Sequence, residues 1–159
     1  MQLNMVEKIS ENLRLEYINS IEYEEFVDMK IKEMAYHAIY AEKLGIEDIY
    51  CNSYTEKQAL KSLDKYKTYI LKNSENKILG FVQLSDFTGI NTGSGVYVNN
   101  LYIKEEYRKM GIATSVLNYL TDKFNEVAFE AYYNIPGNKL YKDLDFIEIG
   151  KIYLKINNN

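Results

Sequence analysis

The chain has 159 residues, of which 47% are apolar and 26% are charged, a composition typical of a globular protein of one domain. Its net charge of −4 argues against a nucleic-acid partner, tRNA included, because such a partner requires a clustered basic face. Cys51 is the only cysteine, which excludes an intrachain disulfide, and we find neither a signal-peptide run nor a membrane-spanning stretch, so we expect a cytoplasmic protein without a membrane partner.

The first part of the chain predicts one strand followed by two helices. Apolar and polar residues alternate over 13–18, which indicates a strand. Apolar residues then recur at helical spacing over 27–41 and stop at Gly45, and a break inside this long helix remains open. The segment from Ser53 to Glu56 is a capping-box pattern that begins a second helix, which we expect to end near Tyr66.

The middle of the chain predicts three strands and a helix. Strands at 67–72 and 77–86 are joined by a polar turn and form a hairpin. The glycine-rich segment 87–95 is expected to be a mobile loop, and 95–103 is the next strand. Apolar residues at i, i+4 spacing over 112–124 predict a helix that lies on a sheet.

Three more elements complete the predicted fold. A strand spans 127–132, a helix runs from Pro136 to about Leu144, and a last strand spans 146–156. Proline suits the first turn of that helix because it has no N–H to leave unpaired. The order of elements predicts an α/β (α+β) fold with a mixed central sheet flanked by helices, and residues 1–159 as one domain.

Residues 101–117 read as a strand, a short basic turn and an amphipathic helix, which begins with Arg108-x-x-Gly111-x-Ala113. A helix N-terminus exposes unpaired N–H groups and the positive end of the macrodipole, which suits a phosphate. Gly111 permits a tight turn and a close approach to an anion, Ala113 keeps the first turn open, and Arg108 and Lys109 add charge. We interpret the turn as a pyrophosphate cradle; the alternative is an ordinary turn with a solvated basic pair.

This segment resembles the acetyl-coenzyme A signature, Gln/Arg-x-x-Gly-x-Gly/Ala, of the GCN5-related N-acetyltransferases. Residues 134–146, which read Asn-Ile-Pro-Gly-Asn-Lys-Leu-Tyr-Lys-Asp-Leu-Asp-Phe, resemble that family's next signature, an Asn, a helix and a Tyr, commonly ending in Gly-Phe. Asp145 stands where Gly is usual, and Asp can adopt a left-handed conformation after a helix. The resemblance covers 96–156 well and 67–86 loosely, and it implies a sheet splayed at the cofactor site.

The resemblance implies direct transfer of an acetyl group from acetyl-CoA to a primary amine of a small molecule or peptide, and the negative charge of the chain favours a cationic acceptor. It implies cofactor contacts through the main chain of the splayed strand, through the turn behind it and through two asparagines: Leu101, Tyr102, Ile103, Arg108, Lys109, Met110, Gly111, Ile112, Ala113, Thr114, Asn134 and Asn138. Plain sheet packing is the other reading of the strand residues, and helix capping that of the asparagines. Members are often dimers, so a homodimer remains open.

Tyr141 follows Asn134 by seven residues, where the family keeps a tyrosine as general acid for the departing thiolate. A phenol has a pKa near 10, so it stays protonated at neutral pH and can donate to a basic sulfur. The chain has 16 tyrosines, and the alternative is an ordinary buried ring. Its position favours the catalytic role.

The general base is not evident from the sequence. The family often places a carboxylate on the splayed strand just before Leu101, where this chain has Asn99 and Asn100. Because an amide cannot accept a proton from an ammonium, either ordered water carries the proton away or a carboxylate arrives from elsewhere. The candidates, although such charges are mostly solvated at the surface, are Glu22, Glu24, Glu25, Glu33 and Glu130.

Two other reactive side chains have simpler explanations. The His37 imidazole suits a base, but it lies beside the apolar residues Met34 and Ala38, which favours a packing role. A lone thiol such as Cys51 is usually a small buried hydrophobe, and one His with one Cys cannot form a metal cluster, so we expect no metal. The missing carboxylate leaves an alternative function: an acyl-CoA-binding sensor of the same fold that has lost transfer. A structural interaction domain that binds no coenzyme is the third.

Overall fold

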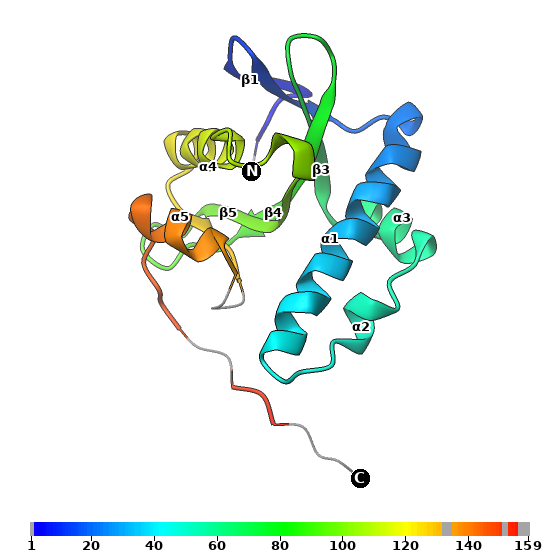
Figure 1. The fold of residues 1–159 in the computed structure, drawn as a ribbon. Coiled ribbons are helices and arrows are strands. Elements are labelled where there is room, and N and C mark those ends of the chain that lie inside the picture. Colours follow the sequence, from blue (N-terminus) through cyan, green and yellow to red (C-terminus); the bar gives the residue numbers. More distant parts are fainter. Residues whose placement is uncertain (1, 132–134, 151–152, 156–159) are drawn as a thin grey trace.

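A six-stranded mixed sheet forms the centre of the computed structural model, which describes residues 2–131, 135–150 and 153–155 (Figure 1). The strands follow one another across the sheet in sequence order: β1 (Val6–Ser10), β2 (Leu13–Tyr17), β3 (Lys67–Lys72), β4 (Ile78–Phe87), β5 (Gly95–Ile103) and β6 (Val127–Ala128). Neighbours from β1 to β5 are antiparallel, and β5 and β6 are parallel. The predicted mixed sheet is therefore confirmed.

Helices cover both faces of this sheet. They are α1 (Tyr23–Lys43), α2 (Ile49–Asn52), α3 (Glu56–Lys65), α4 (Ile112–Lys123) and α5 (Gly137–Asp143), with short 3-10 turns η1 (Ser20–Glu22) and η2 (Glu105–Tyr107). Figure 1 shows α1, α2 and α3 together on one side of the molecule and α4 and α5 on the other. The α/β fold with flanking helices follows from this arrangement.

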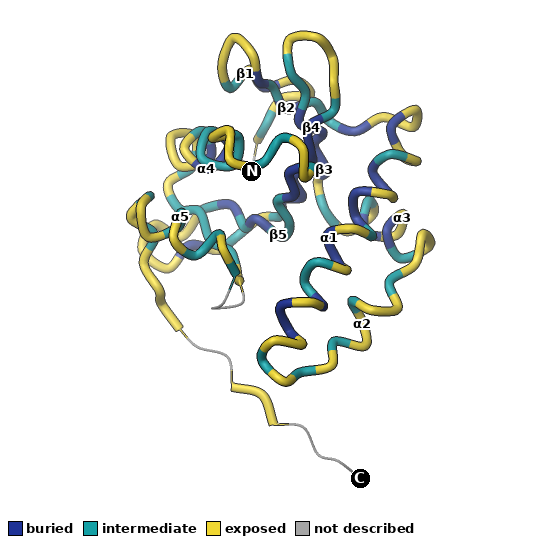
Figure 2. Tube along the Cα trace, viewed as in Figure 1, coloured by how far each residue is buried: buried dark blue, intermediate teal, exposed yellow. Residues whose placement is uncertain are grey.

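The core has two parts because the sheet is buried on both faces. Along β3, Tyr69 and Leu71 pack on the α4 side with Val116 and Leu120, whereas Ile70 packs on the α1 side. This is the alternation that a strand imposes. Figure 2 shows the buried residues concentrated on the strands and on the inward faces of the helices. The two clusters hold α1 and α4 on opposite faces of β5, and both helices border the site.

The sheet opens between β5 and β6. β6 pairs with β5 only at Val96 and Tyr97, although β5 continues to Ile103. Just past the last pair β5 carries a β-bulge, since Leu84 of β4 pairs with Val98 while Gln83 pairs with Asn100. A bulge increases local twist and redirects the strand. In the described part of the chain, the end of β5 therefore has a partner strand on the β4 side alone.

Two helix predictions are revised by the structure. The first helical region is continuous, because α1 runs through 21 residues without a break. The capping box lies two residues later than expected: the Thr55 hydroxyl accepts from the Gln58 N–H, and the Gln58 side chain accepts from the Thr55 N–H at 2.8 Å. The Ser53 hydroxyl instead donates to the Ile49 carbonyl at 2.6 Å and closes α2, so it is not available to cap α3.

The strand predictions fail at both ends of the chain. β1 was not predicted, because its polar and largely exposed residues show no clear apolar alternation. The strand expected at 146–156 is wrong over the described residues 146–150 and 153–155, which form none. The Ile147 and Ile149 side chains are 83% and 71% exposed. Alternation alone does not make a strand, because a strand also needs a neighbour to pair with.

Three hydrogen bonds to one carboxylate hold the glycine-rich segment before β5. The N–H groups of Ile90, Asn91 and Thr92 all donate to the side chain of Glu126, which precedes β6. The expectation of a mobile loop took no account of this long-range contact. None of the helices in the described ranges has the length and apolar character to span a bilayer.

Candidate active site

The turn before α4 has the backbone geometry expected of an anion cradle. Lys109 and Gly111 both adopt the left-handed conformation, with φ of 61° and 78°. The Ser115 N–H makes the helix-closing bond to the Gly111 carbonyl, so the N–H groups of residues 112–114 precede the first such bond. Left-handed residues next to a helix N-terminus turn successive N–H groups towards one place. The turn can therefore receive a phosphate group.

A hollow of about 250 Å³ lies directly over this turn. Its lining joins the end of β5, the turn, the first residues of α4 and one residue of α5: Ile103, Tyr107, Arg108, Lys109, Gly111, Ile112, Ala113, Thr114 and Leu140. Apart from Gly111 and its two chain neighbours, no protein atom lies within 4 Å of the position that a Gly111 Cβ would occupy. Six of the predicted cradle residues thus line one open space, whereas Met110, 67% exposed, is not part of its lining.

The end of β5 offers main-chain groups to the same opening. The Lys104 N–H donates to the Leu79 carbonyl beside β4. Because hydrogen-bonding direction alternates along a strand, Tyr102 also directs its main chain towards β4, and Leu101 and Ile103 direct theirs away from it. The Ile103 carbonyl does accept a bond from outside the sheet, from Arg108 Nε at 2.9 Å. Of the three strand residues predicted to hold the cofactor arm, two therefore face the opening.

Arg108 is fixed between β5 and α1 and does not project into solvent. Its guanidinium lies over two rings, with Cζ 5.0 Å from the Tyr36 centroid and 5.4 Å from the Tyr102 centroid. Stacking of this kind holds the planar guanidinium in one orientation. Arg108 therefore keeps a positive charge next to the cradle. Through its hydrogen bond to the Ile103 carbonyl it also connects the turn to the splayed strand.

Tyr141 lies in an aromatic group on the other side of the opening. Its ring centroid is 4.3 Å from that of Phe129 and 6.4 Å from that of Phe146. Burial raises the pKa of Tyr141, so the phenol remains protonated at neutral pH, as a general acid requires. Its hydroxyl lies above Gly137, where an added Cβ would come within 3.1 Å of it.

The chain reverses after α5 as the sequence suggested. Asp145 is left-handed, with φ of 60°, and the Phe146 N–H donates to the Tyr141 carbonyl at 3.0 Å. This is a Schellman-type helix end in which Asp replaces the usual Gly. The reversal places Phe146 against Phe129. Asn138 lies half-buried at the start of α5, and the predicted position Asn134 lies outside the described residues.

Two tyrosines of α1 that the sequence analysis did not single out border the opening. Tyr36 and Tyr40 join their hydroxyls at 3.2 Å. Burial, with the Tyr40 hydrogen bond and the nearby Tyr141, raises the pKa of Tyr36 to about 12, against the opposing charge of Arg108. Tyr36 is thus close to both predicted site residues, Arg108 and Tyr141. Its spacing of three from Glu33 along α1 is the signal that could have identified it.

The two asparagines of the splayed strand have different partners. Asn99, at the bulge, donates to Ser85 Oγ at 2.8 Å. Asn100 donates to Glu33 Oε1 at 2.9 Å, and Glu33 Oε2 accepts from Lys30 Nζ at 3.0 Å. Glu33 and Lys30 are each 3% exposed. One of the five carboxylates considered as a base therefore reaches the strand from α1.

The other four carboxylates lie in different surroundings. Glu22 pairs with Lys72, and Glu25 pairs with Lys104. Glu24 and Glu130 are exposed. Of this set, the described structure places only Glu33 against the open part of β5. Cys51 packs at 3.8 Å from the Met34 sulfur, and burial raises the pKa of its thiol to about 12, which fits a packing role.

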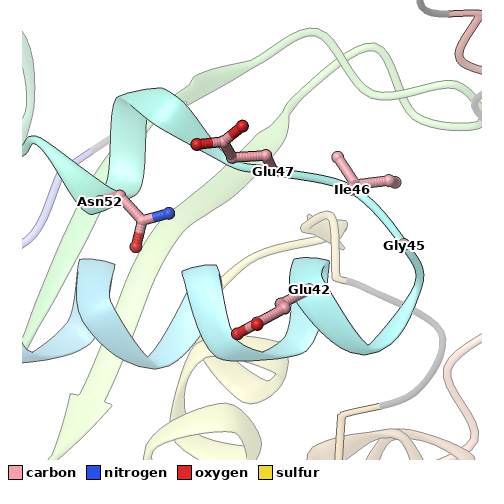
Figure 3. Close-up of a pocket in the computed structure, with 5 residues that line it drawn as sticks. All are labelled: Glu42, Gly45, Ile46, Glu47 and Asn52. Atoms are coloured by element: carbon pink, nitrogen blue, oxygen red, sulfur yellow. The ribbon is translucent and has the colours of Figure 1, made fainter.

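A second hollow, of about 440 Å³, lies between the end of α1 and α2. Figure 3 shows Glu42 on the last turn of α1, with Glu47 and Asn52 on the segment that lies across from this helix. It shares no lining residue with the hollow over the α4 turn. The described residues contain no group of three or more His, Cys, Asp or Glu side chains that could hold a metal ion.

Comparison with known proteins assigns this arrangement to a family. Residues 31–146 match the model of the acetyltransferase (GNAT) family, while no curated protein sequence matches the chain. The aminoglycoside N-acetyltransferase AAC(6')-Iy in complex with CoA has a similar structure, with a TM-score of 0.63 and 13% identity over 92% of this chain and 95% of that one.

Two further solved structures are similar. A predicted acetyltransferase from Clostridium acetobutylicum with acetyl-CoA has a TM-score of 0.63 and 17% identity, over 91% of this chain and 96% of that one. The apo aminoglycoside 6'-N-acetyltransferase AAC(6')-IG from Acinetobacter haemolyticus has a TM-score of 0.62 and 14% identity, over 91% and 98%. At these identities the likeness shows a shared fold.

Proposed function

Because the chain belongs to the GNAT family of acetyltransferases, we propose that residues 1–159 form one acetyl-CoA-dependent N-acetyltransferase domain. It moves an acetyl group directly to a primary amine of a small molecule or peptide. The observation that carries this proposal is the opening of the sheet beside the α4 turn. There, the end of β5 and a left-handed turn border one space, and the half-buried Tyr141 follows Leu140, which also lines it.

The residues present fit the cosubstrate in charge and in shape. The N–H groups of the α4 turn, with Arg108 and Lys109 beside them, would bind the diphosphate. The outward main-chain groups of Leu101 and Ile103 would pair with the amides of the pantetheine arm, as a missing strand would. Asn134 and Asn138 remain proposed contacts to that arm. Acetyl-CoA supplies an activated acyl group, and the protein supplies its position.

Tyr141 completes the proposed chemistry as the general acid. Its phenol is neutral over the physiological range because burial raises its pKa, so it can protonate the sulfur as the C–S bond breaks. The solved neighbours include an enzyme named for aminoglycosides, which are small molecules that carry primary amines, and the acidic net charge suits acceptors of this class.

Calorimetric titration with acetyl-CoA tests the cosubstrate, and release of free CoA thiol tests transfer. The acceptor panel contains an aminoglycoside, a polyamine and a lysine-containing peptide. We expect saturable acetyl-CoA binding and thiol release with at least one amine. No binding at millimolar acetyl-CoA would exclude the proposal.

A sensor that binds acyl-CoA without transferring the acyl group is the second candidate. It is favoured by Asn99 and Asn100, which stand where a base is often found on the splayed strand. The two functions differ in one measurement. Binding of acetyl-CoA without thiol release from any amine in the panel would support the sensor, and turnover with any of them excludes it.

A further inference from the structure

A carboxylate of α1 reaches the splayed strand across the face of the sheet. Glu33 bonds Asn100 through one oxygen and Lys30 through the other, at 2.9 Å and 3.0 Å. An ionised carboxylate can accept about four hydrogen bonds, so two donors do not exhaust its capacity. Asn100 is half-buried, whereas Glu33 and Lys30 are buried, so the cluster meets the opening of the sheet at Asn100.

A buried polar side chain, Gln83, lies on the strand β4 next to Asn100. Its amide nitrogen donates to the hydroxyls of Ser62 and Thr68, each of which donates its own proton to a carbonyl. This fixes the orientation of the Gln83 amide. Its Oε1 atom is fully buried and has no hydrogen-bond partner in the described structure. Gln83 is the register partner of Asn100, so an unused acceptor lies beside the Glu33–Asn100 contact. A buried acceptor without a partner is rare in folded proteins.

The position of Glu33 along α1 connects this cluster to the proposed acid. Tyr36 lies one turn further on, and residues three apart on a helix are surface neighbours. Tyr36 contacts Arg108 of the cradle, and the nearby Tyr141 contributes to the raised pKa of Tyr36. Glu33 therefore reaches β5 through Asn100, and Tyr36, one turn further along α1, lies near both Arg108 and Tyr141. A base and an acid in this relation can serve the two sides of an acyl transfer.

We propose that Glu33 is the proton acceptor for the incoming amine and replaces the carboxylate absent at Asn99 and Asn100. Asn100 is a positioning residue that holds this carboxylate at the splayed strand. The inference rests on the proposed function, since it assigns a residue to that reaction. It also assigns the acceptor class: an amine that arrives as an ammonium ion and needs a buried carboxylate to lose its proton.

The proton balance follows from the reaction. The ammonium nitrogen gives one proton to Glu33, and its freed electron pair forms the C–N bond to the acetyl carbon. The C–S bond breaks, and the sulfur takes the proton of Tyr141. The nitrogen loses a second proton, which restores the Tyr141 phenol, and Glu33 releases its proton to water. The products are the amide, the free thiol of CoA and one proton.

Several titratable groups surround Glu33 and must be considered in any pH profile. Lys30 and His37 lie on α1, and Cys51 and Tyr54 face the cluster from α2 and the segment before α3. Burial lowers the pKa of Lys30 despite Glu33, and burial raises the pKa values of Cys51 and Tyr54 to about 12.

The decisive variant is Glu33→Gln. Its amide can keep both contacts, because Lys30 can donate to the Gln oxygen and a rotated Asn100 amide can accept from the Gln nitrogen. With the panel amine that the wild type acetylates fastest, we expect kcat to fall by about 100-fold or more and the acidic limb of the kcat profile to disappear. Acetyl-CoA affinity should stay within a factor of about two, since Glu33 does not line the cradle.

Three further variants make the result interpretable. The exposed carboxylate Glu24 is the matched control, and Glu24→Gln should leave kcat unchanged. His37→Asn tests the other proton acceptor on α1 and should keep the acidic limb. In Glu33→Gln with Asn100→Asp, the carboxylate and the amide exchange places across the same hydrogen bond, and we expect partial recovery of kcat. If Glu33→Gln alone does not fold, the double variant still tests whether the reaction needs a carboxylate at this contact.

The outcomes separate this inference from the proposed function. A wild type that releases no thiol with any panel amine overturns both. An active wild type whose Glu33→Gln variant folds, binds acetyl-CoA and keeps its kcat and its acidic limb overturns the role of Glu33 alone. Loss of stability in Glu33→Gln together with an inactive exchange variant that is stably folded also overturns it, because the carboxylate would then be structural.

Discussion

The Tyr36 ring of α1 lies against the Arg108 guanidinium of the α4 turn, 5.0 Å from ring centroid to Cζ. The contact joins two elements that cover opposite faces of the sheet. It can form only because β5 ends between them, with the Ile103 carbonyl accepting from Arg108 Nε. The turn proposed to hold the cosubstrate and the helix proposed to carry the base are thus fixed to each other by one side chain.

Arg108→Lys should loosen this connection while keeping the charge. An ammonium group cannot stack on two rings and bond the Ile103 carbonyl in one geometry, so we expect a loss of about 1–2 kcal/mol in unfolding free energy. Acetyl-CoA affinity should also fall, although the positive charge at this position is unchanged. Denaturant unfolding and calorimetry measure the two effects. Lys109→Arg, which alters the neighbouring cation without touching the stack, is the control, and equal effects from both variants would contradict this account.

Tyr141→Phe should lower kcat by about 100-fold and leave acetyl-CoA affinity nearly unchanged. The wild-type rate should fall at high pH, as the phenol loses its proton. Because burial raises the pKa of Tyr141, this limb lies above the ordinary value of about 10. Stopped assays across the alkaline range measure it. Tyr153, 89% exposed, gives the matched variant Tyr153→Phe, and a high-pH limb that survives in Tyr141→Phe would remove Tyr141 from the acid role.

The elements nearest the cosubstrate site were predictable because their signals are local. The strand expected at 95–103, after the glycine-rich segment, and the apolar stripe at 112–124 behind a single glycine identified β5 and α4 with nearly the observed bounds. Asp145 stands where the resembling family usually has Gly, a position at which Asp can become left-handed, and it is left-handed in the structure. Each of these features depends on a few consecutive residues, so a sequence pattern is sufficient to describe it.

The candidate base could not be chosen from sequence because its partner is 67 residues away. Nothing in the sequence favoured Glu33 over the other four candidate carboxylates, and the structure shows that Glu33 accepts a hydrogen bond from Asn100. The same limit applies to the loop before β5, which is held by Glu126 across more than 30 residues. Long-range contacts of this kind depend on how α1 and β6 pack on the sheet, and no local pattern records that.

Gly80→Ala should destabilise the fold strongly, because an added Cβ would lie 2.0 Å from the Tyr102 carbonyl oxygen. The nearest atoms belong to the main chain of Tyr102 and Ile103, which is paired with β4 and cannot move aside without disturbing the end of β5. We expect a loss of about 3 kcal/mol in unfolding free energy, measured by denaturant titration. At Gly150 no atom lies within 4 Å of the corresponding position, so Gly150→Ala is the control. Similar stabilities for the two variants would show that the strands can separate there.

Gly111→Ala separates backbone strain from cosubstrate binding. An alanine at φ of 78° costs about 1 kcal/mol, and its methyl group would project into the open space over the turn. We expect acetyl-CoA affinity to fall by about tenfold. Gly45 has a nearly identical φ of 74° and similar open space, away from the cradle. Gly45→Ala should therefore show the same loss of stability with unchanged affinity, and a parallel loss of affinity would remove the turn from the binding site.

Glu126→Gln should release the segment before β5. The three N–H donors of Ile90, Asn91 and Thr92 lower the pKa of Glu126, although desolvation of the carboxylate acts in the opposite direction. A carboxyl group with a lowered pKa in the folded state contributes its contacts fully above the ordinary glutamate value of about 4.3 and loses them as the pH falls through the lowered value. Protection of these three amides from hydrogen exchange should therefore persist at neutral pH and decline in acid.

In the Gln variant the same protection should be weak at every pH, since one amide oxygen cannot replace two carboxylate oxygens that serve three donors. The Cys51 amide is an internal control. It donates to the Asp48 carboxylate at 2.9 Å on a different part of the surface, and its exchange should not respond to the change at Glu126. If the three amides stay as protected in Glu126→Gln as in the wild type, the loop is held by its own glycine-rich turns, and Glu126 has no part in shaping the edge of β5.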